Sequence, residues 1–157
     1  MALFVLWFHL LAAIVWIGGM LFLALVLIPS LQGLEDSKLR SQLVHLVGRR
    51  FRTVGWIAIG VLITTGILNV IRLGVSPIAL LGTRFGTILG LKLALVSVMI
   101  VLSGVHDFIL GPKLTSSNPR PGSTGSDGLR RTVVTLARVN LLVGITIVLL
   151  GLMLSHG

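Results

Sequence analysis

Apolar residues in this chain gather into four long segments, and the shorter stretches between them hold most of the charge. The segments cover residues 2–28, 53–71, 85–110 and 133–154. Each is long enough to cross a hydrocarbon layer of about 30 Å, which needs roughly 20 residues of helix. A chain inside lipid must satisfy its own backbone hydrogen bonds, as a helix does. The pattern therefore predicts an all-α protein, a four-helix transmembrane bundle forming a single domain over residues 1–157.

Two of the connections between these segments are long, and they differ in character. Residues 30–52 carry apolar side chains at helical spacing, among them Leu39, Leu43 and Leu46, with basic residues between them. This pattern predicts an amphipathic connection at the membrane surface. Residues 112–130 contain the run TSSNPRPGSTGSDG. Its Gly, Pro and Ser content predicts a flexible polar linker.

Lysine and arginine are unevenly distributed among the connections. The first connection holds five of them, the third together with the start of the last segment holds five, and the second holds only Arg72 and Arg84. Basic residues concentrate in cytoplasmic loops. We therefore predict that the first and third connections are cytoplasmic and that both termini lie outside, in a multi-pass protein of the cell (cytoplasmic) membrane.

Composition supports the membrane interpretation and narrows the chemistry. Hydrophobic residues make up 55% of the 157 residues and charged residues only 11%, which is typical of an integral membrane protein. The net charge of +9 arises from bases at the ends of apolar segments, where lipid headgroups explain them, so we exclude nucleic acid as a partner. The lipid bilayer is the expected partner. The absence of cysteine excludes disulfides and thiolate metal sites.

Polar side chains inside apolar segments are costly to bury, so each is a candidate functional residue. His9 lies in the first segment, Lys92 and His106 in the third, and Arg138 and Asn140 at the start of the fourth. Lys92 and His106 are 14 residues apart and share one helical face, to within roughly 40°. His9 and Lys92 match in depth, which predicts that they converge on one internal cavity.

A structural interpretation stays open for several of these residues. His9 could serve only as a hydrogen-bonding partner of a neighbouring helix. Lys92 could extend its ammonium group to the membrane interface. His106 could sit at the level of the lipid headgroups, because it lies near the end of its segment.

A family resemblance begins with the run HLLAAIVWIGGMLF, which resembles the first-helix signature of the CopD-type copper resistance membrane proteins. The runs RRFRTVGWIAIGVLITTGIL, LGLKLALVSVMIVLSGVHDF and ARVNLLVG follow in the expected order, so the resemblance covers all four segments. The wider group includes the HemJ-type protoporphyrinogen oxidases, four-helix proteins that handle porphyrin and haem. The resemblance implies that the histidine, lysine and arginine–asparagine positions of that group correspond to His9, Lys92, Arg138 and Asn140.

The favoured hypothesis, guided by this resemblance, is a CopD-like protein that binds haem b inside the bundle and serves redox chemistry or copper homeostasis. His9 is then the expected axial ligand, and His106 is a candidate second ligand. Lys92, Arg138 and Asn140 complete the candidate cofactor-binding set, with the two cations pairing with carboxylates of the cofactor or of a substrate.

Three alternatives stay open. The first is a copper-handling protein without haem, which uses His9, Met20, Met99 and His106. The second is a structural or accessory subunit of a larger membrane complex, or a homo-oligomer. The third is a HemJ-like oxidase that removes electrons from a reduced tetrapyrrole. The sequence does not decide whether the protein is an enzyme.

Overall fold

Helices account for all the regular structure of the described part of the chain. The computed structural model describes residues 2–72, 74, 78, 82–111, 113 and 124–155, and these ranges contain no strand. Within them, four helical stretches are long and apolar enough to cross a membrane, namely Leu3–Gln32, Ser37–Arg72, Arg84–Leu110 and Arg131–Leu154. The predicted all-α class with four membrane-spanning helices is confirmed. The orientation of the chain in the membrane stays a prediction.

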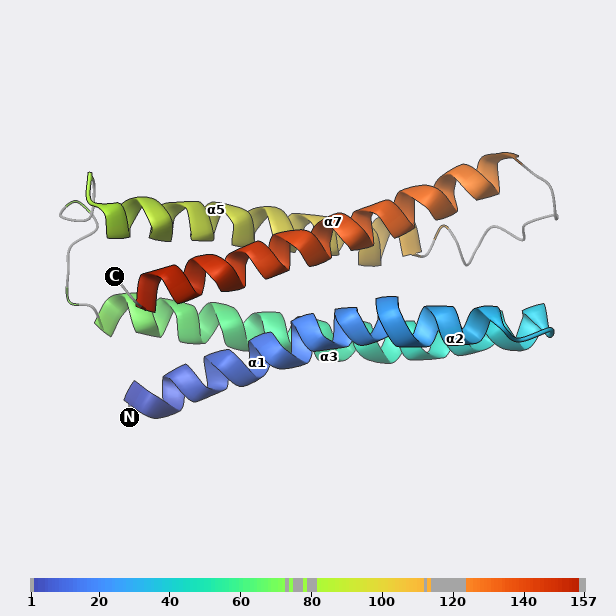
Figure 1. The fold of residues 1–157 in the computed structure, drawn as a ribbon, viewed down its shortest axis with the longest axis horizontal. Helices are drawn as coiled ribbons and strands as arrows, with labels where there is room; N and C mark the ends of the chain where they lie inside the picture. Colours follow the sequence, from blue (N-terminus) through green and yellow to red (C-terminus); the bar gives the residue numbers. More distant parts are fainter. Residues whose placement is uncertain are drawn as a thin grey trace. The chain divides into compact units, whose positions relative to one another are not determined.

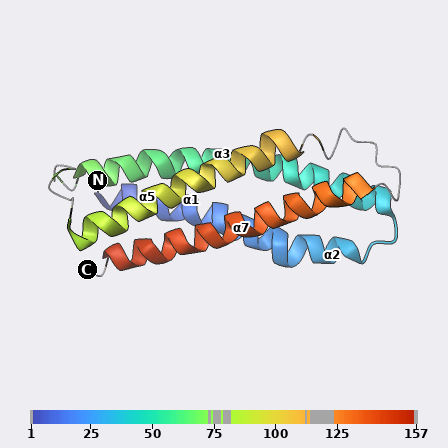
Figure 2. The same cartoon turned by 90° about the horizontal axis from the view of Figure 1, so that it is seen from above.

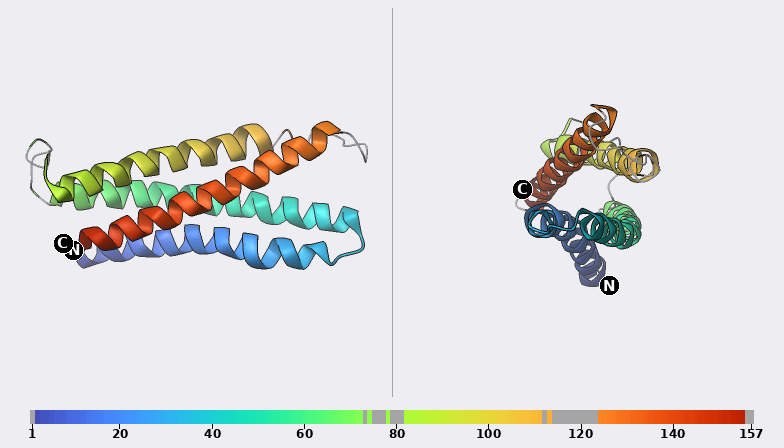
Figure 3. Two further views of the ribbon diagram at one scale, coloured as in Figure 1. Left: turned by 45° about the horizontal axis from the view of Figure 1, so that its top comes forward. Right: turned by 90° about the vertical axis from the view of Figure 1, so that its right-hand side faces the viewer.

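The first of two compact units covers Met1–Val75 and is a pair of long helices. Its first helical stretch consists of α1 (Ala2–Phe22), the π-helical segment η1 (Leu23–Leu27) and α2 (Ile28–Gln32). The second is α3 (Ser37–Arg72). α1 and α3 run side by side along their length (Figures 1 and 3).

Single residues explain how the first helical stretch ends and how α3 begins. Pro29 has no N–H to donate to the carbonyl of Leu25, and the wider π-helical turn directly before it accommodates the missing bond. After α2, Asp36 caps the next helix, because its Oδ1 accepts hydrogen bonds from the backbone N–H of Lys38 at 2.8 Å and of Leu39 at 3.1 Å. As a result α3 begins at Ser37, so most of the predicted surface connection over residues 30–52 is the first part of α3.

The second unit covers Ser76–Gly157 and is also a helical pair. It contains α5 (Arg84–Gly104), the π-helical segment η2 (Val105–Leu110) and α7 (Thr124–Ser155). Thr83 caps α5, since its Oγ1 accepts a hydrogen bond from the backbone N–H of Gly86 at 3.0 Å. α5 and α7 pack against each other and lie side by side in Figures 1 and 2.

The predicted flexible linker over residues 112–130 falls largely outside the described residues, which resume at Thr124 with the start of α7.

Few side chains of the described residues are buried. In the first unit they include Ala12 and Trp16 of α1 and Ala58 and Ile59 of α3. Large apolar side chains elsewhere on both pairs are exposed in the chain alone. Helices surrounded by acyl chains have this distribution, because lipid is as apolar as the side chains it covers.

Candidate functional site

His9 is joined to α3 by a hydrogen bond across the first helical pair. Its Nδ1 lies 2.7 Å from Oγ1 of Thr65, and the Thr65 side chain is buried, with only 7% of the residue exposed. The imidazole itself is half-buried. His9 therefore lies at the seam, where α3 fixes the orientation of its ring.

The hydrogen bonds of Thr65 assign the proton of the imidazole. Oγ1 of Thr65 lies 2.6 Å from the carbonyl oxygen of Val61, a separation that requires the hydroxyl proton between the two oxygens. Because the hydroxyl has no second proton, these two contacts match the tautomer in which Nδ1 of His9 donates to Oγ1 of Thr65. In that tautomer Nε2 carries the lone pair with which an imidazole ligates a metal.

Contacts at three glycines show how α1 and α3 face each other around this bond. A Cβ atom at Gly66 would lie 3.7 Å from Cε1 of His9, and one at Gly55 would lie 3.5 Å from Cδ1 of Trp16. At the other end of the seam the ring of Phe51 packs directly against Gly19 of α1. These three contacts pair low residue numbers on α1 with high numbers on α3, so the helices are antiparallel and in a fixed register.

Lys92 occupies a comparable position in the second unit. Its side chain is half-buried on α5, and Nζ lies 3.4 Å from the position that a Cβ atom of Gly151 on α7 would occupy. Met99 and Ser103, which follow on the same stripe of α5, are both buried. The stripe predicted to carry Lys92 is therefore the one that packs against α7.

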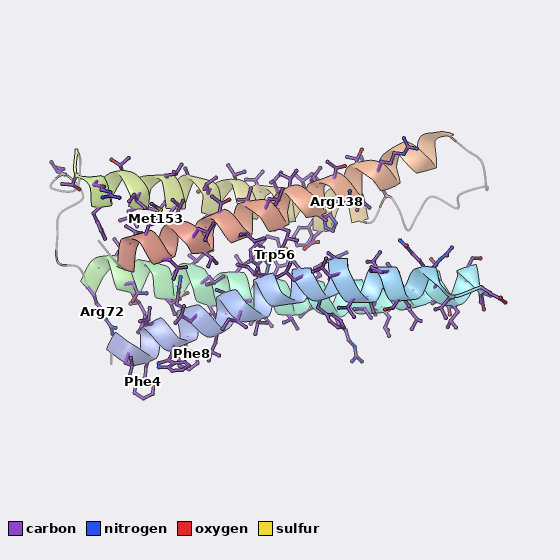
Figure 4. The ribbon with its side chains drawn as sticks, in the orientation of Figure 1. Phe4, Phe8, Trp56, Arg72, Arg138 and Met153 are labelled. Atoms are coloured by element: carbon purple, nitrogen blue, oxygen red, sulfur yellow. The ribbon has the colours of Figure 1, made fainter. Side chains whose placement is uncertain are left out.

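Asn140 of α7 makes a buried hydrogen bond with this stripe. Its Nδ2 donates to Oγ of Ser103 at 2.9 Å, and only 7% of Asn140 is exposed. Arg138, in contrast, is exposed on α7 (Figure 4). Side chains two residues apart point about 200° apart around a helix. Because Asn140 faces the contact between α5 and α7, Arg138 points away from it.

His106 pairs with its sequence neighbour. Its Nδ1 lies 2.9 Å from Oδ1 of Asp107, and the two side chains are 35% and 20% exposed. Both belong to the π-helical segment η2. A carboxylate on Nδ1 orients the imidazole of His106, as Thr65 orients that of His9.

Each contact described above for a candidate residue joins it to a partner within the same unit. The first unit joins His9 to Thr65, and sequence reasoning did not name Thr65. Among the residues that the structure describes, no group of three or more His, Asp or Glu side chains could hold a metal ion.

We expect loss of the Ser103 hydroxyl to weaken the second unit. Ser103→Ala removes the acceptor of the buried bond from Asn140, which between membrane helices stabilises by about 0.6–2 kcal/mol. The unfolding free energy of the full chain in detergent measures the effect. Ser97→Ala is the matched control, because the Ser97 hydroxyl is exposed and bonds only to the Leu93 carbonyl of its own helix. Equal stability of the two variants would contradict this role.

The four apolar helices, with polar groups held at the helix seams, define a multi-pass integral membrane protein. The chain belongs to the CopD family, because the model of the family described as copper resistance protein D matches residues 45–154. This confirms the predicted CopD-type membership. An uncharacterized protein of Aquifex aeolicus (strain VF5) is 28% identical over 153 residues, covering 97% of this chain and 94% of the relative. No solved structure matches the chain.

Proposed function

We propose that this CopD-family protein binds haem b in the cytoplasmic membrane through Nε2 of His9, and that it serves redox chemistry or copper homeostasis. The observation that carries the proposal is the hydrogen bond from Nδ1 of His9 to Thr65. Histidines that ligate metals nearly always donate their other ring N–H to a fixed acceptor, which sets the tautomer and the ring orientation.

The ligands that the protein offers fit haem better than a metal ion without a macrocycle. Haem brings four nitrogen ligands of its own, so the protein has to supply only one or two axial ligands. In the described ranges, His, Asp and Glu side chains do not gather in threes. An apolar segment around His9, from Val5 to Ala13, suits a flat apolar macrocycle in lipid.

When bound, haem iron supplies one-electron transfer. The residues of the chain supply position and environment. Thr65 keeps the proton on Nδ1 of His9, and its own hydroxyl stays bonded to the Val61 carbonyl. Gly66 lies beside the edge of the imidazole. The apolar residues of α1 around His9 would limit the access of water to a reduced centre.

The family description favours a second candidate, copper handling without haem. Nε2 of a neutral imidazole also binds copper, so His9 serves either hypothesis. Additional copper ligands would have to join it.

Parallel titrations of the full chain in detergent separate these functions. With haemin, we expect a Soret band that saturates at one haem per chain and reduced-haem bands after dithionite. With Cu(I) and Cu(II), we expect no copper to survive a chelator wash. Retained copper at one ion per chain without a Soret band would replace the proposal with copper handling. Binding of neither would overturn both.

We expect Thr65→Val to weaken haem binding about 10–100-fold, because loss of the acceptor frees the His9 tautomer and ring. Thr65→Ser should restore most of the affinity, since it keeps the hydroxyl. Haemin titration measures both. Thr64→Val is the matched control, because the neighbouring Thr64 hydroxyl is exposed and bonds to the Gly60 carbonyl. If Thr65→Val binds haemin as tightly as Thr64→Val, Thr65 does not position the ligand.

A further inference from the structure

Two apolar hollows lie on the α1·α3 pair, each with an arginine on its wall. The larger has a volume of about 700 Å³, includes Phe4, Phe8 and Val61 in its lining and ends at Arg72. We name it the Arg72 hollow. The smaller, of about 270 Å³, includes Phe22 and Val54 and is bordered by Arg50; we name it the Arg50 hollow. Figure 4 shows Phe4, Phe8 and Arg72 at the same end of the pair.

Helical spacing places both hollows on one side of the pair. Their linings on α1 include Phe8, Val15 and Phe22, which are seven residues apart. Their linings on α3 include, at the same interval, Val47, Val54, Val61 and Leu68. Residues seven apart lie within about 20° of each other on a helix. The hollows therefore follow one continuous apolar stripe.

His9 does not belong to this stripe. It is one residue from Phe8, so it points about 100° further around α1, and it contacts the Gly66 side of α3. Neither His9 nor Gly66 lines either hollow, but Thr65, the hydrogen-bonding partner of His9, lines the Arg72 hollow. The Arg72 hollow therefore lies beside the proposed haem ligand, whereas the Arg50 hollow is lined by neither His9 nor Thr65.

The two arginines are spaced like the two surfaces of a bilayer. Arg50 and Arg72 are 22 residues apart on the continuous helix α3, which gives about 33 Å at 1.5 Å per residue. The hydrocarbon core is about 30 Å thick. Both side chains are exposed. This spacing matches one guanidinium at each phosphate layer, and the lining of each hollow extends from its arginine into the apolar part of α3.

We propose that these hollows bind the acyl chains of anionic phospholipids, one lipid in each leaflet, with the lipid phosphate paired to Arg72 or Arg50. Apolar contact alone does not retain a lipid, because every acyl chain in a bilayer has apolar surroundings. A hollow of fixed shape retains the chain, and a guanidinium selects the head by pairing with phosphate oxygens. The additional negative charge of an anionic head strengthens this pairing over that of a zwitterionic one.

Native mass spectrometry of the full chain in detergent tests this proposal with phosphatidylglycerol and phosphatidylcholine of identical acyl chains. We expect two retained phosphatidylglycerol molecules per chain and weaker retention of phosphatidylcholine. Arg72→Gln and Arg50→Gln should each weaken one phosphatidylglycerol site about fivefold, and the double variant should weaken both.

A second variant tests the hollow itself. A Cβ atom at Gly60, which lines the Arg72 hollow, meets no atom within 4 Å, so Gly60→Leu fills the hollow without a clash. We expect this variant to lose retention of both lipids at one site. Gly18→Leu is the matched control, because Gly18 also has no atom within 4 Å and lines neither hollow. Equal retention of the two lipids by the wild type, or unchanged retention by the double arginine variant and Gly60→Leu, would overturn the proposal.

Discussion

His9→Ala, purified from cells supplied with haem, should contain at least about tenfold less haem b than the wild-type protein. The substitution removes the proposed axial ligand, and loss of a ligand costs more than the 10–100-fold typical of losing its hydrogen-bonding partner. Soret absorbance and pyridine haemochrome content per chain measure the loss. The cavity left by the imidazole also makes His9→Ala a candidate for rescue by added imidazole, which a purely structural role for His9 would not permit.

His45→Ala is the matched control for this experiment. His45 is a second histidine of the same helical pair, but it is exposed on the first part of α3. We expect its replacement to leave the haem content unchanged. Wild-type haem content in His9→Ala, or equal loss in both variants, would contradict ligation by His9.

Gly55→Leu should destabilise the first unit. Gly55 is buried against Trp16, which is only 4% exposed. A Cβ atom at Gly55 would sit 3.5 Å from Cδ1 and 3.6 Å from Nε1 of the Trp16 ring, so a methyl group fits and an isobutyl group does not. Overpacking of this kind costs about 1–3 kcal/mol. The thermal midpoint of helical circular dichroism in detergent measures the effect.

Two other glycine substitutions serve as controls for this prediction. Gly55→Ala should be close to the wild type, because its methyl group makes ordinary contact with the indole ring. Gly60→Leu introduces the same side chain five residues further along α3, where a Cβ atom meets nothing within 4 Å. We expect its midpoint to stay near the wild-type value. If Gly55→Leu melts together with Gly60→Leu, close approach of α1 and α3 at this glycine does not support the pair.

Hydropathy was sufficient to predict the fold class because lipid permits few alternatives to a helix. It was less informative about where helices begin and end. α3 starts at Ser37, well before the apolar segment at Thr53, because Asp36 caps it and helical structure continues through the basic residues. The capping pattern of an aspartate before a helix is local and could have been recognised in the sequence.

The candidate site was only partly predictable. His9 stood out because titratable groups are rare in lipid. Thr65 did not, because several threonines of the chain bond to carbonyls of their own helix, including Thr64 and Thr87. Only the register of α1 against α3 selects Thr65, and that register follows from the contacts at Gly55 and Gly66.

The candidate cofactor-binding set grouped Arg138 with Asn140, which both lie at the start of the fourth apolar segment. Position along the chain does not by itself give the direction of a side chain. Asn140 bonds to Ser103 at the α5·α7 seam, whereas Arg138 is exposed, because two positions along a helix point to nearly opposite sides. Helical angle, which the sequence does contain, would have separated the two.

The role proposed for His9 depends on where one proton lies. Nitrogen-15 NMR of the haem-free protein, labelled at histidine and assigned by difference with His9→Ala, reports the protonation of each ring nitrogen directly. We expect Nδ1 of His9 to be protonated and Nε2 to carry the lone pair, with Thr65→Val relaxing this preference. A proton on Nε2 in the wild-type protein would contradict the proposed ligand.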